Sequence, residues 1–114
     1  MPLLKIQTNI SVPQEQRAVL LKKASHQVAQ LLGKAESYVM VGLETDCAML
    51  FGGSDHPLAY LELKSIGLPA DRTEEISAAL CELVREVLGI HGNRIYIEFA
   101  DAAPQLWGWN GGTF

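Results

Sequence analysis

The sequence has few of the residues and runs that mark several common protein classes. Its two cysteines, Cys47 and Cys81, form no Cys-x-x-Cys motif, and a reducing compartment would keep both as thiols. The longest apolar stretch, residues 38–43, is far shorter than the roughly 20 residues that a membrane-spanning helix needs. Polar residues such as Lys5 and Gln7 would interrupt the apolar region of a secretory signal. We therefore expect a cytoplasmic protein that does not bind a membrane.

An excess of positive charge is also missing. Nine Lys and Arg residues against thirteen Asp and Glu residues give a formal net charge of -4, so the chain has no long-range attraction to phosphate backbones. The three histidines lack the short spacing that is typical of a zinc site. Dinucleotide-binding, P-loop and Gly-x-Ser-x-Gly motifs are absent. We expect no nucleic-acid partner and no metal ligand set.

The length and composition that remain are those of one globular domain. A chain of 114 residues is short for two domains but can bury a real core without metal or disulfide bonds. The composition, 48% hydrophobic and 19% charged, argues against disorder. We therefore expect a single domain over residues 1–114.

Alternating apolar residues, rich in β-branched and aromatic types, predict four strands, at residues 3–8, 38–44, 58–65 and 94–100. Residues 48–51 are expected to form a further short strand. A strand at the edge of a sheet favours pairing with another chain. The strand pattern therefore already suggests an oligomer.

Two one-sided helical patterns separate the strands. The first helix is predicted to begin near Pro13, and Ser11 and Gln14 have the spacing of a capping box. Gly33 is expected to end it. Acidic residues, Asp71 and Glu74, mark the start of the second helix, and Gly89 marks its end.

The two halves of the chain resemble each other. When Pro69 is set against Pro13, Gly89 falls on Gly33 and the helical apolar residues coincide. We infer an α+β fold made of a duplicated β-α-β unit, with two helices packed on one face of a four-stranded mixed sheet. The apolar residues of the strands share the face under the helices: Leu4, Ile6, Val39, Val41, Leu43, Leu61, Leu63, Ile95, Ile97 and Phe99. The other face is polar with some aromatic residues and would suit a subunit interface or a lumen: Lys5, Gln7, Met40, Glu44, Tyr60, Glu62, Lys64, Tyr96 and Glu98.

The proline at position 2 is the one unusual candidate for chemistry. A small residue there permits removal of the initiator methionine, which would leave a secondary amine at the start of a strand. Burial beside a cation would lower the pKa of that amine toward neutrality, where a base can take a proton next to a carbonyl. Many soluble proteins also begin with Met-Pro and make no use of the proline, so Pro2 alone does not assign a function.

Further short motifs occur in order along the whole chain. They are Thr8-Asn9, Gly33-Lys34, Phe51-Gly52-Gly53-Ser54, Ser65-Ile66-Gly67, Arg94-Ile95-Tyr96-Ile97 and Gly108-Trp109-Asn110 through Thr113-Phe114. With Pro2 they resemble the macrophage migration inhibitory factor family of the tautomerase superfamily, in its bacterial form. The resemblance implies a homotrimer in which the sheets line a central channel.

The resemblance also implies a keto-enol tautomerase that acts on phenylpyruvate-like or dopachrome-like compounds and needs no cofactor. Pro2 would be the base, and Lys34 would hold the carboxylate of the substrate and lower the prolyl pKa. Tyr96 would come from a neighbouring subunit. The remaining residues that the resemblance assigns to substrate binding, or that occupy such positions, are Ile66, Glu98, Trp107, Trp109 and Phe114.

Two of these residues depart from the mammalian pattern. Glu98 stands in place of asparagine, and a carboxylate near Pro2 would raise the pKa of its amine. Trp107 replaces a smaller aliphatic residue. These departures favour an alternative, a trimeric binding or signalling protein of this family with weak or no catalysis. A chain that keeps Met1 has an amide at Pro2, so we expect it to be inactive and its Met1 to lie in or over the pocket.

Overall fold

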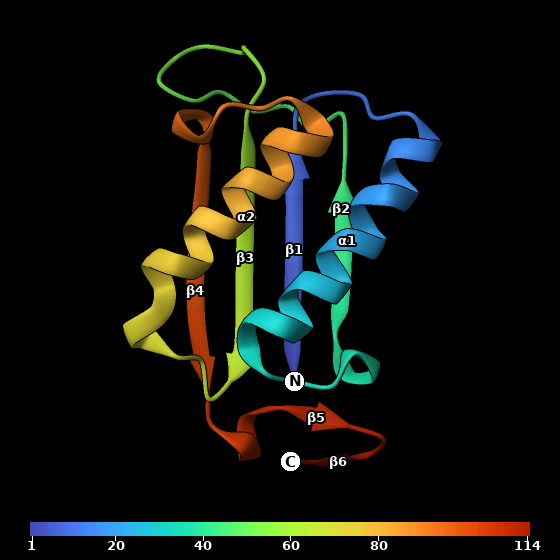
Figure 1. Cartoon of the computed structure of the whole chain (residues 1–114), viewed down its shortest axis with the longest axis vertical. Coiled ribbons are helices and arrows are strands. Elements are labelled where there is room, and N and C mark those ends of the chain that lie inside the picture. The colour runs from blue at the N-terminus through green and yellow to red at the C-terminus, as the bar shows by residue number, and fades with distance from the viewer.

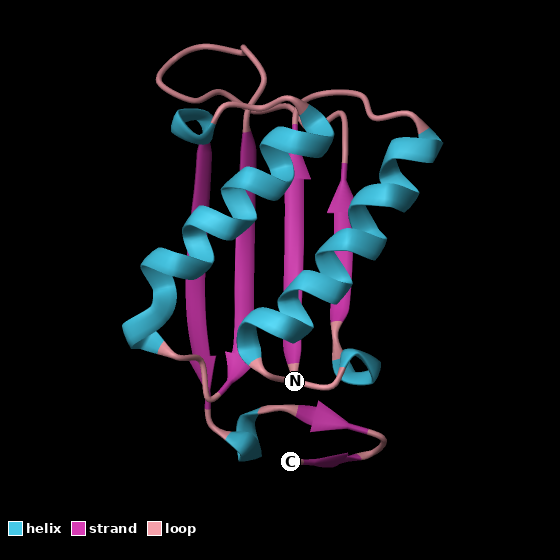
Figure 2. Ribbon diagram, viewed as in Figure 1, coloured by secondary structure: helices cyan, strands magenta, loops and turns pink.

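Two β-α-β units lie side by side in the computed structural model, which describes residues 1–114, and both helices cover the same face of the sheet (Figures 1 and 2). The first unit is β1 (Pro2–Thr8), α1 (Gln14–Leu32) and β2 (Met40–Glu44); the second is β3 (Ala59–Ile66), α2 (Thr73–Leu88) and β4 (Ile95–Ala102). The strands of each unit are parallel, β1 and β3 are antiparallel, and the sheet order is β2-β1-β3-β4. The predicted duplication and mixed sheet are confirmed.

Short elements connect and complete the two units. Single 3₁₀ turns form at Glu36–Tyr38, Ala70–Arg72, Gly92–Arg94 and Pro104–Leu106, and a small hairpin of β5 (Gly108–Trp109) and β6 (Gly112–Thr113) ends the chain. In Figure 1 this hairpin lies below the sheet, beside the N-terminus. Neither helix is long and apolar enough to cross a membrane.

The core lies between the sheet and the helices. Residues of β1 and β3 alternate between buried and partly exposed, as the period of a half-buried strand requires. Leu4, Ile6, Leu61 and Leu63 are fully buried against the apolar stripes of α1 and α2. The predicted inner face is therefore confirmed, and each such side chain contributes about 1.5–3 kcal/mol by leaving water. Five other residues predicted for this face are partly buried against the core: Val39, Val41, Leu43, Ile97 and Phe99.

The helix ends follow the predicted glycines, but the predicted capping box is wrong. Gly33 and Gly89 end α1 and α2 in the left-handed conformation, with φ of 63° and 71°. The residue that precedes α1 is Pro13, and no side chain caps the helix. Ser11 instead donates a hydrogen bond to the carboxylate of Asp46, which follows β2. The hydroxyl that the local pattern assigned to the helix makes a long-range contact instead.

Two strand predictions also need correction. β2 begins at Met40, because the residues before it form a 3₁₀ turn. Residues 48–51 form no strand; Phe51 and Ser54 make one isolated bridge around Gly52 and Gly53, both at positive φ. Arg94 holds this turn by donating hydrogen bonds to the carbonyl oxygens of Phe51, at 2.7 Å, and Ser54, at 3.0 Å. The carbonyl of Phe51, which a strand could pair with a neighbour, thus accepts from Arg94 and from the amide of Ser54.

The Thr8-Asn9 motif joins the end of β1 to the start of β3. Thr8 is fully buried, and its hydroxyl donates to the carbonyl of Leu58 at 2.7 Å and accepts from the amide of Ile10 at 3.3 Å. The side-chain oxygen of Asn9 accepts from the amide of Leu58 at 3.0 Å. These bonds satisfy backbone groups where the sheet ladder stops, and a buried group without a partner is costly.

We expect Thr8→Val to lower the free energy of unfolding by about 1–3 kcal/mol, because a side chain of similar shape leaves the Leu58 carbonyl and the Ile10 amide without their partner. Urea unfolding at fixed protein concentration measures the change as a lower midpoint at constant slope. Thr8→Ser is the control, since it keeps the hydroxyl. A valine variant as stable as the original protein would contradict this account of the motif.

Candidate active site at the start of β1

The pairing of β1 brings three distant segments to one end of the sheet. The parallel register sets Leu3 beside Met40, so the first residues of the chain lie next to the connection that leads into β2. The antiparallel register sets Pro2 beside Ser65, at the end of β3. The C-terminal hairpin lies just beyond this edge (Figure 1). The fold therefore surrounds Pro2 with parts of the chain that the sequence separates.

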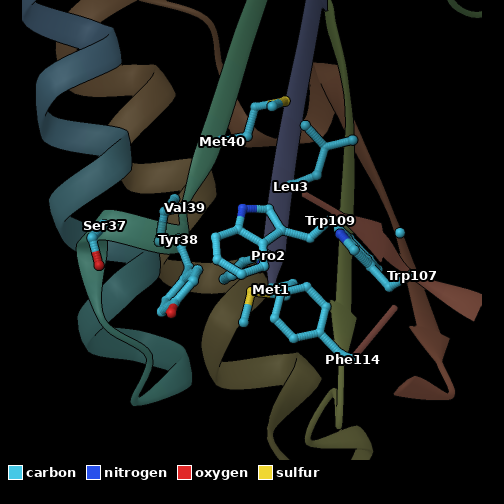
Figure 3. A pocket seen from close by; sticks show the side chains of 11 residues that line it. Met1, Pro2, Leu3, Ser37, Tyr38, Val39, Met40, Trp107, Trp109 and Phe114 are labelled. Carbon is cyan, nitrogen blue, oxygen red and sulfur yellow. The ribbon is translucent and has the colours of Figure 1, made fainter. Parts of the chain in front are cut away.

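A cavity of about 400 Å³ lies at this meeting point, and most of its 11 lining residues are hydrophobic (Figure 3). The N-terminal residues 1–3, the α1–β2 connection with residues 37–39 and the first residue of β2, Met40, form part of its lining. The C-terminal segment contributes Trp107, Trp109 and Phe114. Four residues predicted for the site, Pro2 and these three aromatic residues, thus line one cavity. Pro2 itself is fully buried.

Three aromatic rings form one wall of the cavity. Trp109 and Phe114 are stacked with centroids 5.6 Å apart. The ring of Tyr38 meets both edge-on, at 5.8 Å from Trp109 and 6.2 Å from Phe114. The amide of Phe114 donates to the carbonyl of Trp107 at 3.3 Å, which holds the hairpin closed. Such a wall can contact the face of a planar ligand.

Tyr38 was missed as a site residue because the strand prediction included it. It belongs to the 3₁₀ turn Glu36–Tyr38 instead, and its side chain reaches the cavity (Figure 3). One signal was available. In a parallel β-α-β unit the two strands begin at the same edge of the sheet, so the residue just before the second strand must lie near the start of the first.

Met1 lines the cavity, in agreement with the expected place for a chain that keeps it. The pKa of its amino group is lowered, first by burial and then by the positive charge of Lys34. Both causes disfavour a charged amine at this place. Lys34 follows the end of α1 and is partly buried; it does not line the cavity, but its charge reaches the N-terminus. Burial and the charge of Lys34 thus both favour the neutral form of an amine at this place.

The other predicted site residues lie outside this cavity. Ile66 is close in the fold, one residue beyond the partner of Pro2, but it does not line the cavity. Tyr96 and Glu98 are exposed on the sheet face away from the helices. Asp101 is the β4 residue in line with Pro2, through Ser65. Glu98 is three residues from Asp101 and two strands from β1, which places it about 14 Å from Pro2 by ordinary strand spacings.

Tyr96 and Glu98 have partners of their own on that open face. The ring of Tyr96 lies 4.6 Å from that of Phe51. Glu98 pairs in register with Glu62, which accepts a hydrogen bond from the phenol of Tyr60 at 3.1 Å. The pKa of Tyr60 is raised by loss of water contact, by that hydrogen bond, and by the negative charges of Glu62 and Glu98. Within one protomer, Tyr96 and Glu98 therefore do not meet Pro2.

Comparisons with known proteins agree with this fold. Residues 1–114 match the sequence model of the family described as "Macrophage migration inhibitory factor (MIF)". A macrophage migration inhibitory factor homolog of Brugia malayi is 44% identical over 116 residues, covering 100% of this chain and 99% of that one. The crystal structure of a homologue from Prochlorococcus marinus is 43% identical, with a TM-score of 0.93 over 98% of both chains.

A further solved structure, the macrophage migration inhibitory factor of Trichinella spiralis, is 38% identical with a TM-score of 0.90, over 98% of this chain and 99% of that chain. The matches run from end to end and include both sequence and fold. They confirm the resemblance seen in the short motifs. The chain belongs to the macrophage migration inhibitory factor family.

Proposed function

We propose that this protein is a keto-enol tautomerase for phenylpyruvate-like or dopachrome-like compounds, with the secondary amine of Pro2 as general base once Met1 is removed. The observation that carries the proposal is the buried position of Pro2 in an aromatic cavity where burial and Lys34 lower the pKa of an amine. Membership in a family that includes tautomerases supports it.

The proposed reaction needs only proton transfer. The neutral prolyl nitrogen takes a proton from the carbon beside the substrate carbonyl, and the prolyl ammonium then gives a proton to the enolate oxygen. The ammonium of Lys34 would pair with the substrate carboxylate. The aromatic ring of the substrate would lie against Trp109 and Phe114, two of the three rings of the aromatic wall. No cofactor takes part in these steps.

We further propose that the protein acts as a cytoplasmic homotrimer. Two large apolar side chains that line one surface hollow stand uncovered on one protomer, with Leu50 69% and Tyr96 65% exposed. A monomer leaves few such groups together on its surface. Tyr96 and Glu98 lie too far from Pro2 of their own protomer, so in this proposal they would reach the cavity of a neighbouring one.

A second candidate function is a trimeric binding or signalling protein with weak or no catalysis. The position of Trp107 favours it, because this bulky side chain lines the cavity together with Trp109 and leaves less room for substrate. In a trimer the carboxylate of Glu98 could also oppose Lys34 and raise the pKa of the prolyl amine. The pH dependence of the rate separates the two candidates.

Pro2→Gly tests the base. We expect kcat/KM for the enol-to-keto conversion of phenylpyruvate to fall about a hundredfold, the range of a lost general base. Glycine is also small enough to permit removal of Met1, so intact mass can establish that both proteins carry a free N-terminus. Equal rates for the two processed proteins would end the tautomerase proposal as stated.

Lys34→Gln tests whether the charge of Lys34 lowers the pKa of the prolyl amine. The positive charge of Lys34 disfavours a protonated amine, so its removal raises the pKa of the prolyl nitrogen. Less free base is then present at acidic pH, and we expect the acid limb of the kcat/KM profile to move to higher pH. Loss of the carboxylate contact adds a fall of about 10-fold to 100-fold at the optimum.

The matched control is Lys23→Gln, which removes a lysine that pairs with Glu86 at 3.2 Å on the helix face. Its profile is expected to follow that of the original protein. An unmoved acid limb in Lys34→Gln would contradict the assigned role of Lys34. An essential base that titrates well above pH 8 in the original protein would favour the binding function.

Processing of the N-terminus gives a further test. A chain that keeps Met1 has an amide nitrogen at Pro2 and a side chain in the cavity, so we expect it to be inactive. Treatment with a methionine aminopeptidase is expected to raise activity in proportion to the processed fraction seen by mass spectrometry. Full activity in a sample that retains Met1 would rule out Pro2 as the base.

A further inference from the structure

The connection between α1 and β2 supplies part of the cavity lining and is restrained by the packing of Val39 on the core, but few polar side-chain contacts hold it. Ser37, Tyr38 and Val39 line the cavity (Figure 3). Two backbone bonds shape the turn: the amide of Tyr38 donates to the carbonyl of Ala35 and that of Val39 to the carbonyl of Glu36, both at 3.0 Å. These bonds fix the shape of the turn but not its place relative to α1.

The carboxylate of Glu36 ties this turn to α1. Ser25 Oγ donates to Glu36 Oε2 at 2.9 Å, and His26 Nδ1 lies 3.5 Å from Glu36 Oε1. No other side-chain hydrogen bond or ion pair links residues 33–39 to the rest of the chain. Two adjacent residues of α1 thus meet the two oxygens of one carboxylate, Ser25 through a hydrogen bond and His26 through a contact of 3.5 Å.

The tie acts close to the aromatic wall. Tyr38 is two residues beyond Glu36 in the same 3₁₀ turn, whose rise is about 2 Å per residue. A shift of Glu36 therefore moves Tyr38 relative to Trp109 and Phe114, whose rings it meets edge-on. Glu36 is 50% exposed and His26 66% exposed, and pairs so exposed add little to global stability. Their effect is on the placement of the turn.

We propose that Glu36, held by Ser25 and His26, is a positioning residue that sets Tyr38 against the wall formed by Trp109 and Phe114. The carboxylate does not line the cavity, so it acts through the turn and not on a ligand directly. The consequence for substrate rests on the proposed function; the consequence for the aromatic cluster does not. The effect of removing the carboxylate can therefore be measured in two ways: by kinetics with substrate, which require catalysis, and by the packing of the aromatic rings, which does not.

The experiment compares Glu36→Ala with Glu86→Ala. The second variant is the matched control, because Glu86 is also exposed and also pairs with a residue of α1, Lys23 at 3.2 Å. Near-UV circular dichroism of the unliganded protein reports the packing of the aromatic rings, and steady-state kinetics with phenylpyruvate report KM and kcat. Thermal unfolding shows whether the fold is retained.

We expect Glu36→Ala to weaken the near-UV signal and to raise KM about threefold to tenfold, with kcat within twofold and an unchanged unfolding temperature. Glu36→Gln keeps an acceptor for Ser25 Oγ and is expected to recover most of both losses. Glu86→Ala is expected to match the original protein. If Glu36→Ala lowers the unfolding temperature, Ser25→Ala replaces it, since that change removes one hydrogen bond only.

Two results would overturn the proposal. One is a near-UV spectrum of Glu36→Ala equal to that of the original protein, even with a raised KM, because the carboxylate would then act by its charge alone. The other is the same loss of signal in Glu86→Ala. Absence of phenylpyruvate turnover in the processed original protein would contradict the proposed function instead, and the spectra would still decide the role of Glu36.

Discussion

The pairing of β1 with both of its neighbours is the constraint on which the candidate site depends. Parallel pairing with β2 requires a crossover, which α1 provides, and it returns the chain to the edge where β1 begins. Antiparallel pairing with β3 brings the far end of that strand to the same edge. Pro2 is therefore buried at a position where the start, the first crossover and the C-terminal hairpin converge. A shift of one residue in this register would turn Pro2 to the open face.

The position of Lys34 serves the helix and the site together. α1 ends at Gly33 in the left-handed conformation, and the amide of Lys34 donates to the carbonyl of Ala29 at 3.0 Å. A cation is favoured after the last turn of a helix, where carbonyl oxygens carry partial negative charge. The same cation lowers the pKa of an amine at the start of β1. The charge that the helix end favours thus also disfavours a protonated amine at the start of β1.

Sequence reasoning worked where local rules and burial agree. The inner-face residues and the duplication follow from the periodicity of the apolar residues. The ends of the two helices follow from the left-handed conformation that Gly33 and Gly89 adopt. Tertiary contacts did not override these predictions. Sequence reasoning failed where contacts between residues far apart in the chain determine the local structure. Ser11 bonds to Asp46 and not to its helix, and the loop that Arg94 holds replaces the expected strand at residues 48–51. Among the predicted site residues, Trp107, Trp109 and Phe114 line the same cavity as Pro2. The place of Tyr38 follows from the parallel topology of the first unit and not from local alternation, which assigned it to a strand.

The distance between Pro2 and Glu98 means that one protomer cannot bring both residues to the same substrate. Both residues belong to extended strands of one sheet, whose spacings leave no freedom to bring them together. A loop movement cannot close such a gap. If Tyr96 and Glu98 act on substrate in the proposed reaction, the acting pair must come from another copy, and catalysis then depends on protein concentration through assembly. If they do not, the proposed chemistry rests on Pro2, Lys34 and the aromatic wall of a single chain.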